Sequence, residues 1–427
     1  MKRTWIKKRF ILLTVSIISV WLAYLISQSS EAYELGLKAN KYVELNLNKN
    51  WGIRKKALEF STLLLSYYPH PEYVKYGKPD KEVGIESRYS PKLSSITAYS
   101  NIIAINTTKQ LIGAFRKAKA GDVILLSAGT YHMQGKRFKL KNSGTAERPI
   151  LLMAESFGEV ILKMDSLEGL YLDQANWSIS NLIFEGVCKS HSKCEHAIHL
   201  SGDADNVEIS HNRFINFNAH IKSNGKNYYF PDHVRISGND FYNNSARNTT
   251  NSVTPIDVVG GDDWVIENNF IADFALKKQG KFTVAYGAFL KGGGKRGKFV
   301  NNVVNCAWKL PHQSYLDIRI GLSLGGGGTN GKFCPEKKCD FEHSQGIIEN
   351  NLILNCRNDV GIYLNKAQDS LVKQNTLLNT LGIDARFSAS TVMIEDNQFH
   401  GRIKTRNGAR ISATNNTSLG LHQQASL

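Results

Sequence analysis

Residues 266–272 have the sequence Ile-Glu-Asn-Asn-Phe-Ile-Ala, and residues 348–354 have the similar sequence Ile-Glu-Asn-Asn-Leu-Ile-Leu. The shared feature is an Asn followed by apolar positions, and it recurs along the chain at Asn181, Asn212, Asn239, Asn269, Asn302, Asn351, Asn375, Asn397 and Asn416. In five of these places the preceding residue is another Asn or an Asp, and the intervals are 31, 27, 30, 33, 49, 24, 22 and 19 residues. A near-regular mark of this kind indicates a repeat architecture.

The repeat predicts an all-β fold, a right-handed parallel β-helix over residues 101–420. One coil of such a solenoid takes roughly 20–25 residues, and the excess in longer repeats can loop out on one face. Asn tolerates the left-handed backbone conformation at a tight corner. Stacked Asn side chains can also hydrogen-bond from coil to coil and so satisfy polar groups buried at the corner.

A capping helix is predicted before the first coil. Leu111, Ala114, Phe115 and Ala118 have helical spacing, and Gly121-Asp122 ends the helix. A buried strand follows at residues 123–126, then a turn into the next strand at 128–131, and further apolar segments of the strand stack at 149–152 and 160–162. A solenoid needs a cap because its end coil would otherwise expose the core.

The first 32 residues have the pattern of an export signal. Five basic residues lie among the first nine, residues 10–26 are almost wholly apolar, and the next charged residue is Glu31. Ser30-Glu31-Ala32 suits signal cleavage. The apolar run is long for a cleaved signal and slightly short for a membrane span, so cleavage and retention as an anchor both remain open. Either way we expect an exported protein that is periplasmic, attached to the cell envelope or secreted.

Residues 33–100 differ from the repeats that follow. Apolar and basic residues alternate there, and Tyr67-Tyr68-Pro69-His70-Pro71 follows. We interpret this region as one or two helices and an extended linker that form a stalk or cap. Residues 421–427 are interpreted as a tail.

The charge balance points to a polyanionic partner. The chain has 53 Lys and Arg against 37 Asp and Glu, a formal net charge of +16. Nucleic acid, anionic lipid and acidic glycan would all suit that charge. Because exported proteins seldom meet DNA, we expect an acidic polysaccharide and no nucleic acid. Membrane contact is expected only through the N-terminal segment, and the protein is expected to be a monomer.

The six cysteines fit an oxidising compartment. Cys188 with Cys194, and Cys334 with Cys339, could close short loops. Cys306 and Cys356 occupy similar places after two successive repeats, within disulfide reach of each other. No Cys-x2-Cys spacing occurs, so a metal site built from these residues is not expected.

A second strand in each coil predicts the position of a site. Seven strands beginning at Ile198, Ile256, Ala288, Leu322, Ile362, Ile383 and Ile403 can be aligned. Since side chains alternate across a strand, their second and fourth positions must point outward. The second positions are His199, Asp257, Phe289, Ser323, Tyr363, Asp384 and Lys404, and the fourth are Ser201, Val259, Lys291, Gly325, Asn365, Arg386 and Arg406. Mixed acids, bases and aromatic residues on one face suit sugar binding, although any solenoid shows polar residues to solvent.

Two features extend this face. Gly292-Gly293-Gly294 and Gly325-Gly326-Gly327-Gly328 follow adjacent strands in the same register, either as flexible turns or as a flat floor for a polysaccharide chain. The repeat between Asn302 and Asn351 has the largest insertion, and it carries Trp308 and His312 as further candidate binding residues.

Residues 107–162, with Ala-Gly-Asp-Val-Ile-Leu-Leu at 120–126 and Ala-Gly-Thr-Tyr at 128–131, resemble the cap and first coils of bacterial β-helix polysaccharide lyases. The resemblance is to the alginate lyase and chondroitinase B family. It implies β-elimination at a uronate, with a Lys as base, an assisting Arg, and a calcium ion held by carboxylates. Lys291 in Ala-Phe-Leu-Lys-Gly is similar to the family lysine.

Two positions depart from the family pattern. Val284 and Tyr286 stand where glutamates would precede the lysine, and Leu324-Gly325 stands where the arginine would follow. We therefore expect no cofactor; calcium stays an alternative, for which the expected carboxylate ligands are missing. Lys291 and Arg386 are then the predicted neutralisers of the uronate carboxylate, with Tyr363 or His199 as base or acid. Asp257, Ser323, Asn365, Asp384, Lys404, Arg406, Trp308 and His312 are the predicted substrate-binding residues.

Two other functions remain open. A glycoside hydrolase resembling polygalacturonases would use Asp257 and Asp384 as acid and base. Gly260-Gly261-Asp262-Asp263 and Arg402-Ile403-Lys404 are similar to short pieces of that family's signatures. The other alternative is a non-catalytic glycan-binding or envelope-structural β-helix.

Overall fold

The computed structural model describes residues 30–46, 54–59, 65, 83–86, 101–277 and 283–419. The chain divides into two compact units, residues 1–72 with 420–427 and residues 73–419. In the first unit, helix α2 (Ser30–Asn46) and a helical segment at 54–59 agree with the helices predicted between residues 33 and 100. None of the described helices is long and apolar enough to cross a membrane. The export signal up to residue 29 and the 421–427 tail lie outside the described residues.

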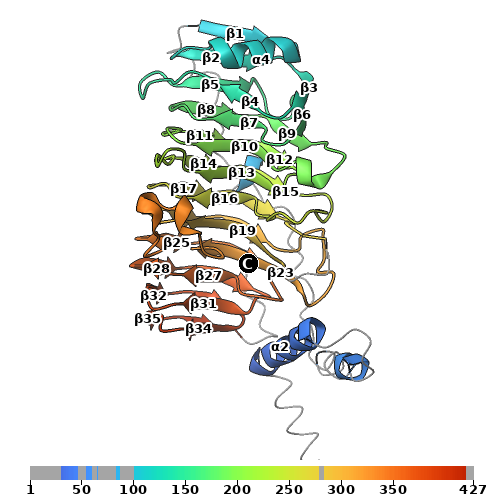
Figure 1. The fold of residues 1–427 in the computed structure, drawn as a ribbon, viewed down its shortest axis with the longest axis vertical. Coiled ribbons are helices and arrows are strands. Elements are labelled where there is room, and N and C mark those ends of the chain that lie inside the picture. The colour runs from blue at the N-terminus through green and yellow to red at the C-terminus, as the bar shows by residue number, and fades with distance from the viewer. Residues whose placement is uncertain are drawn as a thin grey trace, which may run out of the picture. The chain divides into compact units, whose positions relative to one another are not determined.

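The second unit is the predicted right-handed parallel β-helix, in which each coil contributes a strand to sheet A, then sheet B, then sheet C (Figure 1). All pairings between these strands are parallel, for example Asp257 opposite Phe289 and Phe289 opposite Ser323. Sheet A contains β1 (Asn101–Ile105), β2 (Asp122–Leu126), β5 (Ile150–Ala154), β8 (Trp177–Ser180), β11 (Glu208–Ser210), β14 (Arg235–Ser237), β17 (Val265–Glu267), β21 (Lys298–Val300), β25 (Ile347–Glu349), β29 (Ser370–Lys373), β32 (Thr391–Glu395) and β35 (Arg410–Thr414).

Sheets B and C complete the coils. Sheet B contains β3 (Gly129–Gly135), β6 (Val160–Ser166), β9 (Ile183–Gly186), β12 (Arg213–Ile215), β15 (Asp240–Tyr242), β18 (Phe270–Ala272), β22 (Val303–Asn305), β26 (Leu352–Leu354), β30 (Thr376–Leu378), β33 (Gln398–Phe399) and β36 (Thr417–Ser418). Sheet C contains β4 (Phe138–Leu140), β7 (Leu170–Leu172), β10 (His196–Ser201), β13 (Ala219–Asn224), β16 (Ile256–Val259), β19 (Thr283–Lys291), β23 (Asp317–Leu324), β27 (Ile362–Asn365), β31 (Gly382–Arg386) and β34 (Arg402–Arg406).

Short elements lie in the connections. Strands β20 (Gly294–Lys295), β24 (His343–Ser344) and β28 (Ala367–Gln368) form a small sheet between sheets C and A. Within the described residues, the 3-10 turns are η1 (Gly84–Glu86), η3 (His191–Lys193), η4 (Gly331–Phe333) and η5 (Pro335–Lys337). Segment 83–86 packs against the β-helix: Gly84 N donates to Asn268 O at 2.7 Å, and Val83 packs on Phe270.

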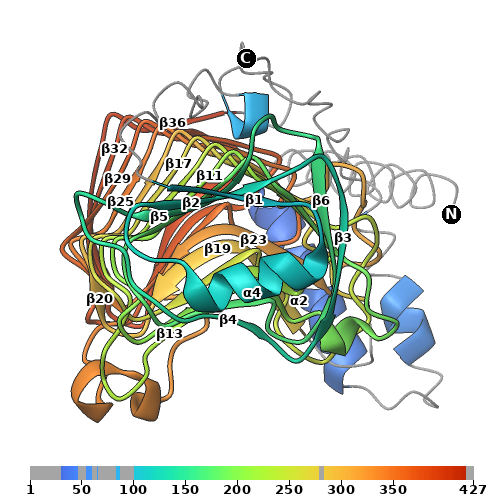
Figure 2. The same cartoon turned by 90° about the horizontal axis from the view of Figure 1, so that it is seen from above.

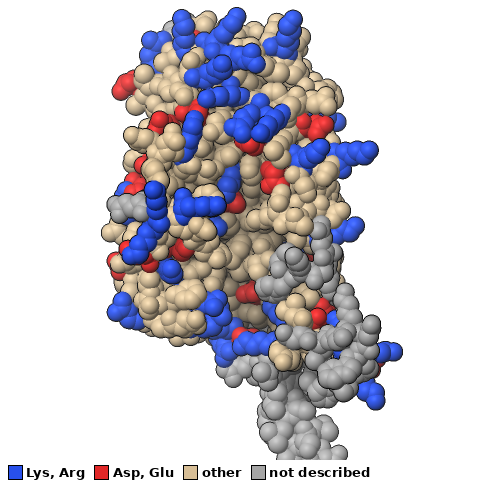
Figure 3. Space-filling view, viewed as in Figure 1, with Lys and Arg blue, Asp and Glu red and all other residues tan. Residues whose placement is uncertain are grey.

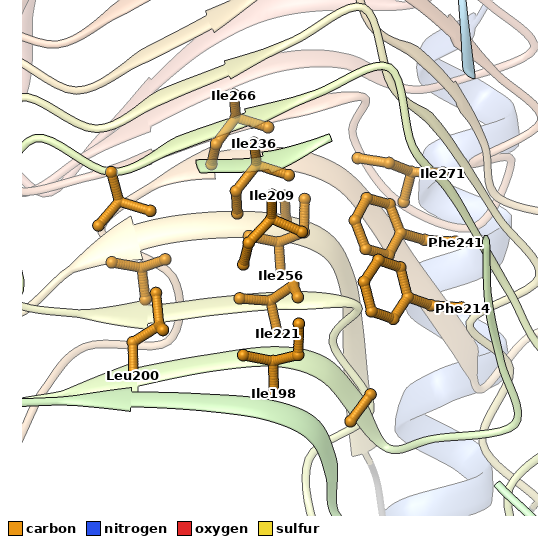
Figure 4. Packing of buried hydrophobic residues seen from close by; sticks show 14 of the residues in the cluster. Ile198, Leu200, Ile209, Phe214, Ile221, Ile236, Phe241, Ile256, Ile266 and Ile271 are labelled. Atoms are coloured by element: carbon orange, nitrogen blue, oxygen red, sulfur yellow. The ribbon is translucent and has the colours of Figure 1, made fainter. Parts of the chain in front are cut away.

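The core is built from stacked side chains. Ile198, Ile221 and Ile256 follow one another on sheet C, and Phe214 stacks on Phe241 on sheet B with ring centroids 4.9 Å apart (Figure 4). All five side chains are fully buried. Each fully buried side chain of this size contributes about 1.5–3 kcal/mol, which explains why the inward positions of every coil are apolar.

Helix α4 (Thr108–Lys117) covers the first coil, as predicted (Figure 2). Thr107 caps it in a capping box with Gln110, and Leu111, Ala114 and Phe115 are its buried residues. Apolar contacts of α4 therefore close the N-terminal end of the β-helix, as a solenoid cap must do.

The predicted Asn marks form what we call the asparagine ladder, at the corner between sheets A and B. Its members are Asn212, Asn239, Asn269, Asn302, Asn351, Asn375, Asn397 and Asn416. Each amide donates to the side-chain oxygen of the next, as from Asn302 to Asn351 at 2.9 Å. The same amide also donates to a carbonyl of the preceding coil, as from Asn302 to Ile266 O at 2.8 Å.

Two details of the predicted corner were wrong. The left-handed residue is the one before each ladder Asn, for example Asn301 with φ 56° and Asn350 with φ 54°. Asn181 belongs to that left-handed position, with φ 62°, and Leu182 occupies the ladder position of its coil. The double Asn in the sequence therefore reflects two different requirements, a left-handed backbone and a buried amide.

The three predicted disulfides are all present. Cys188–Cys194, Cys306–Cys356 and Cys334–Cys339 have Cα–Cα distances of 5.7, 5.0 and 5.6 Å. Cys306–Cys356 joins successive coils just after sheet B, whereas the other two close loops beside sheet C.

Candidate active site on the outer face of sheet C

The predicted outward columns are present on sheet C. The register places Tyr171, His199, Lys222, Asp257, Phe289, Ser323, Tyr363, Asp384 and Lys404 side by side. The second column contains Ser201, Asn224, Val259, Lys291, Asn365, Arg386 and Arg406. Figure 3 looks onto this face, where Lys and Arg gather toward the capped end and the surface is hollowed over the middle strands.

The glycine loop 325–328 divides this face, and we call it the glycine ridge. Gly326 N donates to Ser323 Oγ at 3.0 Å, and Asn365 Nδ2 donates to Gly326 O at 2.9 Å. Gly325 has φ +107°, and a Cβ there would lie 2.0 Å from Asn365 O, so only glycine fits. Ser323, Phe289 and Asn365 point outward but are buried. The glycine ridge therefore covers these three side chains, while Gly327 itself is exposed.

The half of the face nearer the cap contains Lys291, at the end of β19. Its Nζ donates to Gly328 O at 3.3 Å and lies 4.6 Å from the centre of the Phe289 ring. Burial lowers the pKa of Lys291, and the nearby charge of Lys222 lowers it further, against the raising effects of Asp257 and Glu342. A half-buried lysine with a lowered pKa is the kind of group that can accept a proton.

Lys222 and Asp257 form an ion pair beside Lys291. Lys222 Nζ lies 2.7 Å from Asp257 Oδ1, and the two side chains are 19% and 10% exposed. Asp257 is one strand from Lys291 and Lys222 is two, so each is within one or two steps of about 4.8 Å. Lys222 thus adds a second cation to the region where Lys291 lies.

Glu342 supports the lysine from the insertion. Its carboxylate accepts Gly292 N at 3.1 Å, Thr329 N at 2.7 Å and Thr329 Oγ1 at 2.6 Å. These bonds join the turn after Lys291 to the glycine ridge, and Glu342 itself is buried. The position of Lys291 is therefore fixed by the insertion as well as by its strand.

His199 lies toward the cap, in a polar cluster of its own. Its Nε2 lies 2.5 Å from Asn224 Oδ1, its Nδ1 lies 3.5 Å from Glu168 Oε2, and its ring meets Tyr171 edge-on at 5.3 Å. Because Asn224 Nδ2 donates to Gly225 O, Asn224 Oδ1 is the acceptor and His199 Nε2 carries the proton. Burial lowers the pKa of His199 despite the raising effects of Asn224 and Glu168.

Beyond the glycine ridge the face has a different composition. A hydrogen bond joins Tyr363 and Arg386, and Arg406 pairs with Asp384. Burial raises the pKa of Tyr363, against the lowering effect of Arg386. Lys404 follows on the last strand of the sheet.

The four predicted catalytic residues therefore do not form one centre. His199 and Arg386 each lie three strands from Lys291, on opposite sides of it, which is about 14 Å at 4.8 Å per strand. The predicted hydrolase pair also fails, since Asp257 and Asp384 are four strands apart, about 19 Å. Carboxylates that cleave a glycosidic bond together are at most about 9.5 Å apart.

Trp308 and His312 lie away from the outward columns. Both belong to the connection from β22 to β23. Trp308 packs edge-on against Tyr242 and Phe270, on the outer side of sheet B. His312 is half-buried, and its pKa is lowered by partial burial first and then by the charges of Arg319 and Arg357. The long insertion therefore contributes to packing at these two positions, and neither joins the Lys291 region.

The calcium positions of the resembled family do not suit a metal ion here. Tyr286 and Val284 belong to an apolar cluster with Phe289, Ile318 and Ile320 on the outer side of sheet C. Among the residues that the structure describes, no group of three or more His, Cys, Asp and Glu could hold a metal.

Sequence reasoning missed Lys222 and Glu342. Lys222 had a signal, because Ile221-Lys222-Ser223-Asn224 has the same alternation as the seven aligned strands. Glu342 had none, since a residue fifty positions after Gly292 meets it only through the fold.

The sequence model of the chondroitinase B family matches residues 105–221. The resemblance to β-helix polysaccharide lyases is thereby confirmed for that stretch. No curated protein is similar enough in sequence to match the chain. The matched stretch covers the cap and the coils as far as β13, and it ends before Lys291.

Several solved structures are similar to the chain. An alginate lyase from Paenibacillus sp. str. FPU-7 is 16% identical, with 73% of this chain and 99% of that chain covered and a TM-score of 0.42. A rhamnogalacturonan lyase is 16% identical, with 72% and 81% covered and a TM-score of 0.43. The A-module of a mannuronan C-5 epimerase from Azotobacter vinelandii is 14% identical, with 71% and 88% covered and a TM-score of 0.36.

Proposed function

We propose that this protein is a polysaccharide lyase that cleaves a uronate-containing polysaccharide by β-elimination on the cap side of the glycine ridge. The observation that carries the proposal is Lys291, a half-buried lysine with a lowered pKa beside the Lys222–Asp257 pair. The family match on residues 105–221 supports the same class of enzyme.

The C5 proton of a uronate is weakly acidic, so its removal requires a base and a neutralised carboxylate. In the proposed reaction Lys291 Nζ takes the C5 proton. The electrons of the C5–H bond form a double bond between C4 and C5, and the bond from C4 to the glycosidic oxygen breaks. The leaving oxygen takes a proton from the Lys291 ammonium or from water.

Lys222 replaces Arg386 as the proposed neutraliser of the reacting carboxylate. It lies two strands from Lys291, whereas Arg386 lies three strands away beyond the ridge. Asp257 holds the Lys222 ammonium in place at 2.7 Å. Arg386, Lys404 and Arg406 then serve neighbouring uronates of a chain that runs along the helix axis. No metal takes part in the proposed mechanism.

The test is to incubate the full-length protein with a panel of acidic polysaccharides, with and without chelator, and follow the ultraviolet absorbance of an unsaturated uronate. The proposal predicts a rise on at least one substrate that survives the chelator. A rise that the chelator abolishes would contradict the metal-free site. Binding without any rise would favour the non-catalytic glycan-binding function.

A further inference from the structure

A second hollow lies beside sheet C, at the connections that lead to sheet A, and we call it the tyrosine pocket. It has a volume of about 450 Å³, within the roughly 300–1,000 Å³ typical of small-molecule sites. Its wall includes Gly261 and Gly293, each two residues beyond an outward position of sheet C. The pocket therefore lies next to the strand end that bears Lys291 but outside the outward columns of sheet C.

Exposed aromatic rings stand at this pocket. Tyr228 and Tyr229 are 59% and 64% exposed, although aromatic residues usually bury most of their surface. They belong to a tight hairpin in which Lys226 N donates to Tyr229 O at 2.9 Å and Tyr229 N donates to Lys226 O at 3.1 Å. The hairpin leaves both rings largely exposed, although Lys337 Nζ lies 5.6 Å from the centre of the Tyr228 ring. The exposed ring surface can stack on the apolar face of a sugar ring.

Phe230 and Phe341 supply a fixed apolar floor. Phe230 lies directly on Gly225 and Gly260, where an added Cβ would come within 2.4 and 2.0 Å of its ring. Those two glycines therefore make the space that the ring fills. The disulfide loop Cys334–Cys339 forms the opposite wall, through Pro335, Lys338 and Cys339.

The charge of the pocket is opposite to that of the Lys291 region. Five aspartates and two lysines line it. Lys338 pairs with Asp340 at 2.7 Å, and Arg296 pairs with Asp262 at 3.0 Å. The remaining three carboxylates, Asp203, Asp205 and Asp232, form no ion pair with a residue that the structure describes.

Two of these carboxylates, Asp205 and Asp232, are held in place by backbone N–H groups. Asp205 Oδ1 accepts Asp232 N at 2.9 Å, and Asp232 Oδ1 accepts Asp262 N at 2.7 Å. Burial raises the pKa of Asp232, against the lowering effect of Asp262 N–H, while the charges of Asp262 and Asp205 raise it further. A further carboxylate brought here would meet the same repulsion, whereas a sugar hydroxyl or amine could donate to these oxygens.

We propose that the tyrosine pocket is a second carbohydrate site, which binds a sugar without a carboxylate, either neutral or carrying an amine. Aromatic faces and fixed carboxylate acceptors are complementary to the apolar face and the hydroxyl groups of such a sugar. The sugar is a side branch of the polysaccharide on sheet C or part of a separate glycan. The proposal does not depend on lyase activity.

The test uses the full-length protein and saturation-transfer NMR with glucose, galactose, glucosamine and N-acetylglucosamine as probes, and glucuronate as the acidic comparison. We expect transfer to at least one of the four probes and none to glucuronate. The double replacement Tyr228→Ala and Tyr229→Ala should weaken that binding about tenfold, the loss expected when stacking is removed. Because both rings are exposed, thermal unfolding should be unchanged.

Two matched variants complete the test. Phe333→Ala removes another exposed ring, 50% exposed, which does not line the pocket, and it should leave binding unchanged. Lys291→Met should also leave it unchanged, which separates this site from the proposed lyase centre. No transfer to any of the four probes, or transfer that survives the double replacement, would overturn the proposal.

The source of the sugar follows from one further comparison, on an acidic polysaccharide with neutral side branches and on the same polymer with its branches removed. If the double replacement weakens binding only to the branched polymer, the pocket holds a branch. If it weakens monosaccharide binding but neither polymer, the pocket holds a separate glycan.

Discussion

The asparagine ladder and the outer face of sheet C run along the same coils, yet they differ in how strictly they repeat. At the ladder, every coil from Asn212 to Asn416 places the same side chain in the same bonds. On sheet C the corresponding column changes from His199 to Lys222, Asp257 and Phe289. Where the same residue repeats in every coil, each coil meets the same structural requirement. Where the residue changes from coil to coil, individual side chains are available to contact a ligand.

The largest predicted effect is on the rate of the reaction, from a replacement on the outer face of sheet C. Lys291→Met should lower the rate of unsaturated uronate formation about a thousandfold, within the range for loss of a general base. Thermal unfolding, followed by circular dichroism, should stay the same, since Lys291 is not in the core.

The control is Lys298→Met, on strand β21 of sheet A in the next coil, where the side chain is exposed and the rate should not change. If the Lys291→Met protein keeps more than about a tenth of the rate of unsaturated uronate formation, Lys291 is not the base.

The next largest effect is on stability, from a replacement in the asparagine ladder. Asn302→Ala deletes amide bonds to Asn351 and Ile266 O and leaves the donors of Asn269 without their acceptor. We expect the free energy of unfolding in urea to fall by about 3 kcal/mol, because each buried orphan group costs about 1–3 kcal/mol. The lyase rate at low temperature should be unchanged.

Asn301→Gly tests the neighbouring left-handed position. Glycine accepts φ near 56° without strain, and the one side-chain bond that is removed, from Asn350 Nδ2 to Asn301 Oδ1, is exposed. Stability should therefore change by less than about 1 kcal/mol. If Asn302→Ala and Asn301→Gly lower the free energy of unfolding equally, the hydrogen bonds of the asparagine ladder do not stabilise the fold more than the neighbouring position does.

Histidines inside the coils should make stability depend on pH. Burial lowers the pKa of His220 to about 3 and that of His343 to about 3, from an ordinary 6.5. Below pH 6.5 the unfolded chain therefore binds more protons than the folded one, and stability falls as pH falls. Each histidine should account for about 2 kcal/mol of the loss between pH 7 and pH 5.

His220→Phe, between Phe217 and Phe241, should remove its share of this pH dependence in urea unfolding at pH 7 and pH 5. His132→Gln, at an exposed site, should remove none. If His220→Phe leaves the slope unchanged, His220 is already protonated in the folded protein at pH 5.

The smallest effect is expected beyond the glycine ridge. Arg386→Ala should raise the KM for the polysaccharide about threefold to tenfold and leave kcat almost unchanged, because the arginine contacts a neighbouring uronate. The difference from the unchanged protein should shrink at high salt, as charge interactions are screened. A loss of kcat comparable to that of Lys291→Met would place the chemistry on the Tyr363 side of the ridge.

These differences also explain what the sequence could predict. The ladder, the capping helix around Leu111 and Phe115, and the three disulfides were predictable because each follows from spacing along the chain. The outward columns were predictable from strand alternation, apart from the missed strand with Lys222.

What could not be predicted depends on loops that return from a distance. The glycine ridge covers Phe289 and Ser323 because of bonds to Ser323 and Asn365, which no local pattern indicates. Glu342 meets Gly292 only after the insertion has folded back. The distance between strands also decided which predicted residues can act together, and it separated His199 and Arg386 from Lys291.

The proposed cleavage of a uronate polymer by elimination on the outer face of sheet C is tested by the mass of the products formed in water enriched in oxygen-18. Elimination predicts fragments with an unsaturated end and no oxygen-18. Saturated fragments that carry oxygen-18 would instead show hydrolysis, and the absence of fragments from every acidic polysaccharide tested would contradict the proposal.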